Sequence, residues 1–130
     1  LRVARRYPKS CWQLGGAGSV GSQSLLGIPR LAELRQRLDP ERSVVIWPFE
    51  TGLRPPDASI GVVIAEMWPS MLVEPEDLPP WWIRDAAQVD RSARRLRRAD
   101  RSGELDQWFA PSVDDPDAVV AEEGWILGVT

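Results

Sequence analysis

The stretch Ile60-Gly-Val-Val-Ile-Ala-Glu66-Met-Trp-Pro69 is an apolar run that ends on a carboxylate and stops at a proline. Its central residues are β-branched, and a short continuous run of this kind is typical of a strand that is buried on both faces. The stretch Ser43-Val-Val-Ile-Trp47-Pro-Phe-Glu50 repeats the arrangement, with a second Trp-Pro step beside an acid. The two runs predict adjacent strands over residues 43–49 and 60–67, parallel or nearly so. The short connection between them leaves an antiparallel pairing open.

Helices are predicted on both sides of these strands. Pro29 suits a first helical turn, leucines at three-to-four spacing follow it, and Asp39-Pro40 ends the helix. The longest helix is expected at 84–101, with its apolar face formed by Ala86, Val89, Ala93 and Leu96. Shorter helical pieces are expected at 103–110 and 116–122, and residues 124–129 are expected as an edge strand or a docked tail.

The predicted fold class is α/β, with a small central sheet flanked by helices. Residues 1–28 form a basic, Gly- and Ser-rich N-terminal segment, and residues 29–130 form the α/β domain. The tryptophans Trp12, Trp47, Trp68 and Trp125 lie in or beside apolar runs, where burial is the ordinary outcome. The residues expected to be largely buried are Trp47, Ile46, Val63, Ile64, Val89, Leu96 and Ile126.

Composition excludes several classes of function. The chain contains no histidine, which excludes a Ser-His-Asp triad and a His-ligated zinc site within it. A metal would need oxygen ligands, which favours magnesium, manganese or calcium. The single Cys11 favours a reducing, cytoplasmic location, and no apolar run approaches the length of a membrane span. The sequence begins at Leu1 rather than at a methionine, which is compatible with a missing upstream segment.

Four acids are candidates for a functional site. Glu66 and Glu50 come at the C-terminal ends of the predicted strands, where open α/β sheets place their ligands. Asp85 and Asp90 fall at opposite edges of the apolar face of the predicted helix 84–101. Acids beside a buried sheet cost desolvation energy unless they are paired or hold a metal. Structural alternatives stay open, because Asp85 suits a first helical turn and Asp90 can pair with Arg94.

The remaining arginines of the helix 84–101 and a glycine-rich segment suggest two further interpretations. Arg91, Arg94, Arg95, Arg98 and Arg101 lie opposite the predicted apolar face, as a solvated surface or as contacts to phosphates. Gly16-Ala-Gly18-Ser-Val-Gly21 satisfies the dinucleotide-binding pattern G-x-G-x-x-G. No buried strand is predicted before it, and the next strand-terminal acid, Glu50, comes later than that pattern requires. A loop before a helix is the better interpretation.

Three motifs together resemble a known family. They are Val63-Ile-Ala-Glu66-Met-Trp-Pro69-Ser, Asp85-Ala-Ala-Gln-Val-Asp90 and Glu123-Gly-Trp125-Ile-Leu. The chain is similar to a family of uncharacterised bacterial proteins with an RNase H-like nuclease fold, over approximately residues 10–129. The resemblance implies a divalent-metal-dependent phosphodiester hydrolase that acts on nucleic acid. It implies catalytic roles for Glu66, Asp85 and Asp90.

The metal site follows from the same acids. We expect Mg²⁺ or Mn²⁺ to be held by Glu66, Asp85 and Glu50, because clustered carboxylates favour a hard divalent ion. The acid that such enzymes carry on their first strand has no counterpart here, so the chain resembles the C-terminal part of the fold. We therefore expect weak metal binding and little or no hydrolysis. The alternatives are a non-enzymatic α/β interaction or structural domain and, less favoured, nucleotide binding through Gly16–Gly21.

Overall fold

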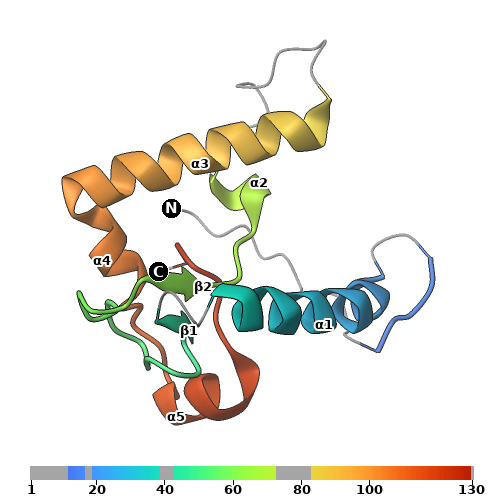
Figure 1. Ribbon diagram of the computed structural model, residues 1–130, viewed down its shortest axis with the longest axis horizontal. Coiled ribbons are helices and arrows are strands. Elements are labelled where there is room, and N and C mark those ends of the chain that lie inside the picture. The colour runs from blue at the N-terminus through green and yellow to red at the C-terminus, as the bar shows by residue number, and fades with distance from the viewer. Residues whose placement is uncertain (1–11, 17–18, 39–42, 73–82, 130) are drawn as a thin grey trace. The chain divides into compact units, whose positions relative to one another are not determined.

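The computed structural model describes residues 12–16, 19–38, 43–72 and 83–129 (Figure 1). The chain divides into two units, Leu1–Val44 with Ser59–Val62 and Val45–Ala58 with Val63–Thr130. None of the described helices is both long enough and apolar enough to cross a membrane. The described elements are α1 (Val20–Leu38), β1 (Val44–Ile46), β2 (Val62–Ile64), α2 (Pro69–Leu72), α3 (Arg84–Ser102), α4 (Glu104–Trp108), α5 (Pro116–Ala118) and the π-helical turn η2 (Val119–Glu123).

β1 and β2 form a two-stranded sheet at the positions that the two apolar runs predict. The Val62 amide donates to the Ser43 carbonyl at 3.0 Å, and the Trp47 amide donates to the Ile64 carbonyl at 2.9 Å. Both strands therefore run in the same direction, so the predicted parallel pairing is confirmed and the antiparallel alternative is wrong. With the surrounding helices, the sheet gives a small α/β fold.

Both strands are shorter and less buried than predicted. After Ile46 the chain enters turns, in which the Glu50 amide donates to the Ile46 carbonyl at 2.9 Å. The Trp47–Pro48 peptide bond is cis. All residues of β2 are only half-buried, so the prediction of a strand buried on both faces is wrong. A sheet of two strands leaves each strand with one neighbour and an open edge.

α1 begins at Val20, so the prediction that this helix opens at Pro29 is wrong. A proline inside a helix removes one backbone hydrogen bond, here the bond to the Leu25 carbonyl. The helix continues through Pro29 because residues 31–38 are all strong helix formers. The domain boundary predicted between residues 28 and 29 falls inside this helix.

α3 confirms the helix predicted at 84–101, although α1 is equally long, and the end of α3 has a clear cause. Gly103 adopts φ 73°, the left-handed conformation that ends many helices, and its amide donates to the Asp100 carbonyl at 3.2 Å. The chain then turns directly into α4, which lies against the end of α3 (Figure 1). α3 also packs against α2, whereas helix-to-sheet packing was predicted.

The buried side of α3 differs from the predicted apolar face. Val89 is 66% exposed, so its predicted burial is wrong, and Ala86 and Ala93 of the predicted apolar face are also exposed. The fully buried residues of α3 are Ala87, Ser92 and Ala99. Small side chains allow neighbouring elements to approach the helix backbone closely, which a count of apolar residues on a face does not anticipate.

The core lies in the second unit and is centred on Trp47, which is 1% exposed. Its ring meets the Phe109 ring edge-on, with centroids 5.7 Å apart. Ala99, Trp108 and Leu127 complete the buried cluster, and Val63, Leu96 and Trp125 are among the half-buried residues packed against it. The predicted burial of Trp47 is confirmed. Ile46, Val63, Ile64, Leu96 and Ile126 are half-buried.

The other tryptophan predictions have mixed outcomes. Trp68 and Trp125 are half-buried. Trp12 is 86% exposed, so its expected burial is wrong.

The C-terminal run is a docked tail and not a strand. Asp115 caps α5 by accepting a hydrogen bond from the Ala118 amide at 3.0 Å, as N-terminal aspartates do. η2 follows and ends at Gly124, whose φ of 71° only glycine adopts easily. The Leu127 amide donates to the Glu66 carbonyl at 2.9 Å, and the buried Leu127 side chain fixes the tail to the core.

Candidate functional site

Two of the predicted site acids are exposed at the ends of secondary-structure elements. Glu66 follows β2 and is exposed, and its backbone carbonyl accepts a hydrogen bond from the Leu127 amide. Asp85 is exposed in the first turn of α3, where a carboxylate interacts favourably with the helix dipole.

The other two acids make local structural contacts. The Glu50 carboxylate accepts a hydrogen bond of 2.7 Å from the Ile46 amide. Glu50 and Ile46 are thus joined through both backbone and side chain, which satisfies a backbone donor at the end of β1. The Asp90 carboxylate accepts a hydrogen bond of 2.8 Å from Arg94 Nε, one turn further along α3. Sequence spacing had left this ion pair open as an alternative to catalysis, and the structure contains it.

Across residues 12–16, 19–38, 43–72 and 83–129, no three His, Cys, Asp or Glu side chains form a group that could hold a metal ion. The catalytic roles of Glu66, Asp85 and Asp90, and the metal site of Glu66, Asp85 and Glu50, stay predictions from the sequence.

The glycine-rich segment lies partly outside the described residues, which omit Ala17 and Gly18. Where the chain is described, Ser19 Oγ donates to the Gly16 carbonyl, and the Gly21 amide donates to the Gln13 carbonyl at 3.2 Å. α1 begins at Val20, within the motif rather than after its last glycine. The adjacent Trp81 and Trp82 would offer a stacking platform for a base or a sugar, but they also lie outside the described residues.

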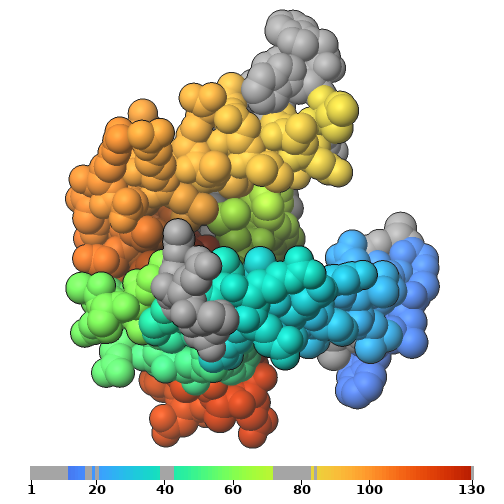
Figure 2. All heavy atoms as spheres, viewed as in Figure 1, coloured from blue at the N-terminus to red at the C-terminus, as the bar shows by residue number. Residues whose placement is uncertain are grey.

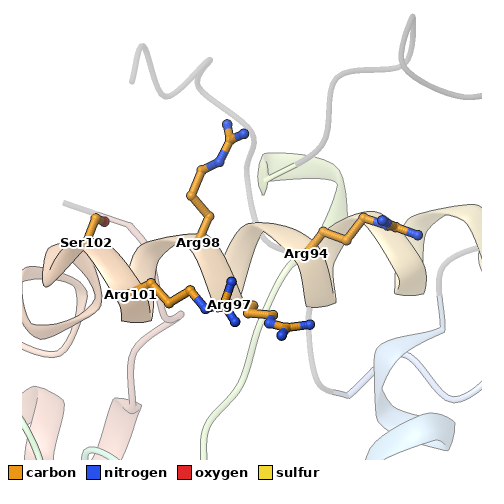
Figure 3. Close-up of a pocket in the computed structure, with 5 residues that line it drawn as sticks. All are labelled: Arg94, Arg97, Arg98, Arg101 and Ser102. Atoms are coloured by element: carbon orange, nitrogen blue, oxygen red, sulfur yellow. The ribbon is translucent and has the colours of Figure 1, made fainter.

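Basic side chains gather on α3 instead. An open recess of about 500 Å³ lies along this helix, and the described residues that line it are Arg94, Arg97, Arg98, Arg101 and Ser102. Much of α3 lies at the molecular surface in the space-filling view (Figure 2). The four guanidinium groups fan out from the helix rather than converge on one point (Figure 3). We call Arg94, Arg97, Arg98 and Arg101 the arginine face.

The arginine face has the spacing i, i+3, i+4, i+7, which places four side chains on one side of a helix. At 1.5 Å per residue, Arg94 and Arg101 are separated by about 10 Å along the helix axis. Arg94, Arg98 and Arg101 are among the arginines predicted from the sequence to lie opposite the apolar face, whereas Arg97 was missed. The same spacing rule that was applied to the apolar residues of this helix would have found it.

Arg95 differs from the arginine face because it makes structural contacts with α4. Arg95 is outside the arginine face and forms a bidentate ion pair with Glu104. The distances from its two terminal nitrogens to the carboxylate oxygens of Glu104 are 2.9 and 2.5 Å. Its guanidinium carbon also lies 4.7 Å from the centroid of the Trp108 ring. The hydrogen bonding between Arg95 and Glu104 lowers the pKa of the Glu104 carboxyl and raises the pKa of the Arg95 guanidinium. Arg95 therefore ties α3 to α4.

Within the arginine face, only Arg94 has an ion pair with a described residue, which is Asp90. Arg97, Arg98 and Arg101 form none with any described side chain, so three full positive charges face solvent. Ser102 Oγ donates to the Ala99 carbonyl at 3.1 Å, which commits its proton to the helix. The recess can thus hold anions through guanidinium groups rather than through this hydroxyl.

No family model matches this chain, and no curated protein or solved structure matches it at a significant level.

Proposed function

We propose that this chain is a non-enzymatic domain that binds the phosphate backbone of nucleic acid along the arginine face. The observation that carries the proposal is the set of three arginines, Arg97, Arg98 and Arg101, that have no ion-pair partner among the described residues and line one recess. Like charges at three-to-four spacing repel one another and destabilise a helix slightly. A bound polyanion removes that repulsion.

The chemistry of the arginine face suits phosphates. Guanidinium groups present planar, forked donors that match phosphate oxygens and stay charged at all physiological pH values. Because the four groups are spread along about 10 Å of helix, they suit a repeating anion better than one small anion. α3 contains no aromatic residue on which a base could stack. Recognition is therefore of the backbone and independent of base sequence.

The charge of the chain is unevenly distributed along the sequence. α3 carries seven arginines and three aspartates, whereas residues 103–130 carry seven acids and no lysine or arginine. The net charge of the whole chain is −3. A polyanion is therefore attracted to α3 and repelled by residues 103–130, whereas residues 1–42, with eight lysines and arginines against three acids, are also basic. Binding through α3 weakens as salt screens its charges.

The hydrolase that the sequence resemblance implies stays a prediction with its own test. Thermal melts with and without millimolar Mg²⁺ or Mn²⁺ would compare wild type with Glu66→Gln. If Glu66 ligates the ion, metal raises the melting temperature of wild type and not of the variant, as ligand linkage requires.

The proposed binding is tested by fluorescence anisotropy with labelled oligonucleotides of two unrelated sequences at 50 mM salt. We expect similar affinities for both sequences and a loss of at least about tenfold in Arg97→Gln/Arg98→Gln/Arg101→Gln, which removes three phosphate contacts. The control, Arg30→Gln/Arg37→Gln/Arg54→Gln, removes the same number of positive charges from exposed arginines elsewhere, of which Arg30 and Arg37 pair with Glu33. Equal losses in the two triple variants, or no binding by wild type, would overturn the proposal.

A further inference from the structure

Asp90 and Arg94 form the contact on which this inference depends. Arg94 Nε lies 2.8 Å from Asp90 Oδ2, at the i, i+4 spacing that lets the two side chains meet on a helix. The Arg94 side chain is 74% exposed, and the Asp90 side chain is 37% exposed. The pair therefore lies beside Arg97, Arg98 and Arg101 at the surface and is accessible to a ligand that binds them.

We infer that Asp90 acts as an internal competitor for phosphate, which holds Arg94 and limits the arginine face to three arginines available for backbone contacts. The inference rests on the proposed function and deepens it, because it assigns a regulatory role to a residue of that same surface. Asp90 was predicted from the sequence as a catalytic acid. Its contact with Arg94 gives it a different role at the same position.

The competition has two parts. The hydrogen bond occupies only Nε of Arg94, so the terminal nitrogens keep their N–H donors for another acceptor. The Asp90 charge nevertheless neutralises Arg94 and repels a phosphate that approaches it. Arg94 can thus donate a hydrogen bond to a bound backbone, but it releases no counterion when it does so.

Asp90 remains an anion under the conditions in which nucleic acids bind. The hydrogen bond from Arg94 is the largest cause that lowers the pKa of Asp90, and the charges of Arg94 and Arg91 act in the same direction. The Asp90 carboxylate therefore keeps its negative charge at neutral pH and competes with phosphate for Arg94. Only substitution of Asp90, or its displacement from Arg94, ends this competition.

α3 offers a matched control for the loss of one negative charge. Asp100 is an exposed aspartate of the same helix and forms no ion pair with any described residue. Asp100→Asn changes the net charge by the same amount as Asp90→Asn but releases no arginine. A difference between the two variants isolates the effect of freeing Arg94 from the general effect of charge.

The experiment measures binding of a labelled duplex oligonucleotide over a range of salt concentrations. Wild type, Asp90→Asn, Asp100→Asn and Asp90→Asn/Arg94→Gln are compared, with circular dichroism to verify that each is folded. We expect Asp90→Asn to bind roughly tenfold more tightly at 50 mM salt and to steepen the slope of log affinity against log salt by about 0.9, the value for one added phosphate contact. The double variant should return to the wild-type slope.

The outcomes separate this inference from the proposed function. If wild type binds and the triple arginine variant does not, but Asp90→Asn behaves like Asp100→Asn, the function stands and the competitor role of Asp90 is overturned. If neither wild type nor Asp90→Asn binds, the proposed function itself fails. If the gain in Asp90→Asn persists after Arg94→Gln, Arg94 is not the group that Asp90 restrains, and the inference also fails.

Discussion

Trp47 Nε1 donates a hydrogen bond of 3.2 Å to the Phe109 carbonyl oxygen, between residues that are 62 positions apart in the chain. The two rings also meet edge-on, an arrangement that adds to the burial of both. This pair connects the end of β1 to the end of α4 and thereby fixes the position of α3, which carries the arginine face.

Replacing Trp47 by Phe should lower the free energy of unfolding by about 2 kcal/mol or more. The change leaves the buried Phe109 carbonyl without its donor and removes part of a fully buried ring. Urea denaturation measures the effect. Trp12→Phe is the control, because Trp12 is 86% exposed and a surface change falls within about 0.5 kcal/mol. A loss of stability for Trp47→Phe as small as that of the control would contradict the assignment of Trp47 to the core.

Gly124→Ala should destabilise the protein by about 1–3 kcal/mol, since φ 71° with ψ −175° is a region that glycine alone adopts easily. A Cβ at this position would also lie 3.0 Å from Cζ of Phe49. Gly103→Ala is the comparison: Gly103 has a similar φ of 73° but a ψ of 6°, the ordinary left-handed region, and no atom within 4 Å of the added Cβ. Chemical denaturation that gives Gly103→Ala the larger loss would contradict a cost from both the backbone conformation of Gly124 and the contact with Phe49.

The Arg95–Glu104 pair predicts a pH dependence of stability. The hydrogen bond from Arg95 lowers the pKa of Glu104 from its ordinary value of 4.5, so the folded state binds the proton less tightly than the unfolded state. The stabilisation is therefore complete above pH 4.5 and is lost as pH falls through the lower, folded-state value. Glu104→Gln should melt at a lower temperature than wild type at pH 7, and the gap should narrow in acid.

Thermal melts from pH 7 to pH 3 test this trend, with Asp106→Asn as the control. Asp106 lies in the same short helix, is exposed, and has no ion pair in the described part of the chain. A gap between wild type and Glu104→Gln that stays constant with pH would mean that the ion pair contributes no stability.

Two apolar residues of α3 lie seven positions apart on the same side of the helix and are expected to contribute differently to stability. Leu96→Ala should cost about 2 kcal/mol, towards the lower end for a leucine truncation, because Leu96 is half-buried against the core cluster. Val89→Ala should change stability by less than about 0.5 kcal/mol, because Val89 is 66% exposed. Equal losses in urea denaturation would contradict this difference in burial between Leu96 and Val89.

The elements of this fold were predictable where a local pattern determines them. Runs of Val and Ile predicted the positions of β1 and β2. The helical spacing of apolar residues and arginines over 84–101 predicted α3 to within one residue at each end. The start of α1 was not predictable, because Pro29 suits a first turn and its cost inside a helix was outweighed by the residues that follow.

The side of α3 that is buried was also not predictable. Ala87, Ser92 and Ala99 carry little hydrophobic signal, and they are buried because small side chains permit close approach of neighbouring elements. For the candidate site, the spacing of residues allowed Asp90 to be either a site acid or the ion-pair partner of Arg94. The choice depends on side-chain positions in the folded protein, which the sequence does not give. The arginine face was visible in the sequence, but Arg97 was not counted in it.

The salt dependence of binding tests the central claim most directly. For a duplex oligonucleotide, three arginines that each neutralise one phosphate predict a slope of about −2.7 for log affinity against log salt. The account predicts this slope for wild type and for Arg30→Gln/Arg37→Gln/Arg54→Gln, and a slope near zero for Arg97→Gln/Arg98→Gln/Arg101→Gln. A wild-type slope that survives in the α3 variant, or that falls equally in both triple variants, would contradict binding by the arginine face.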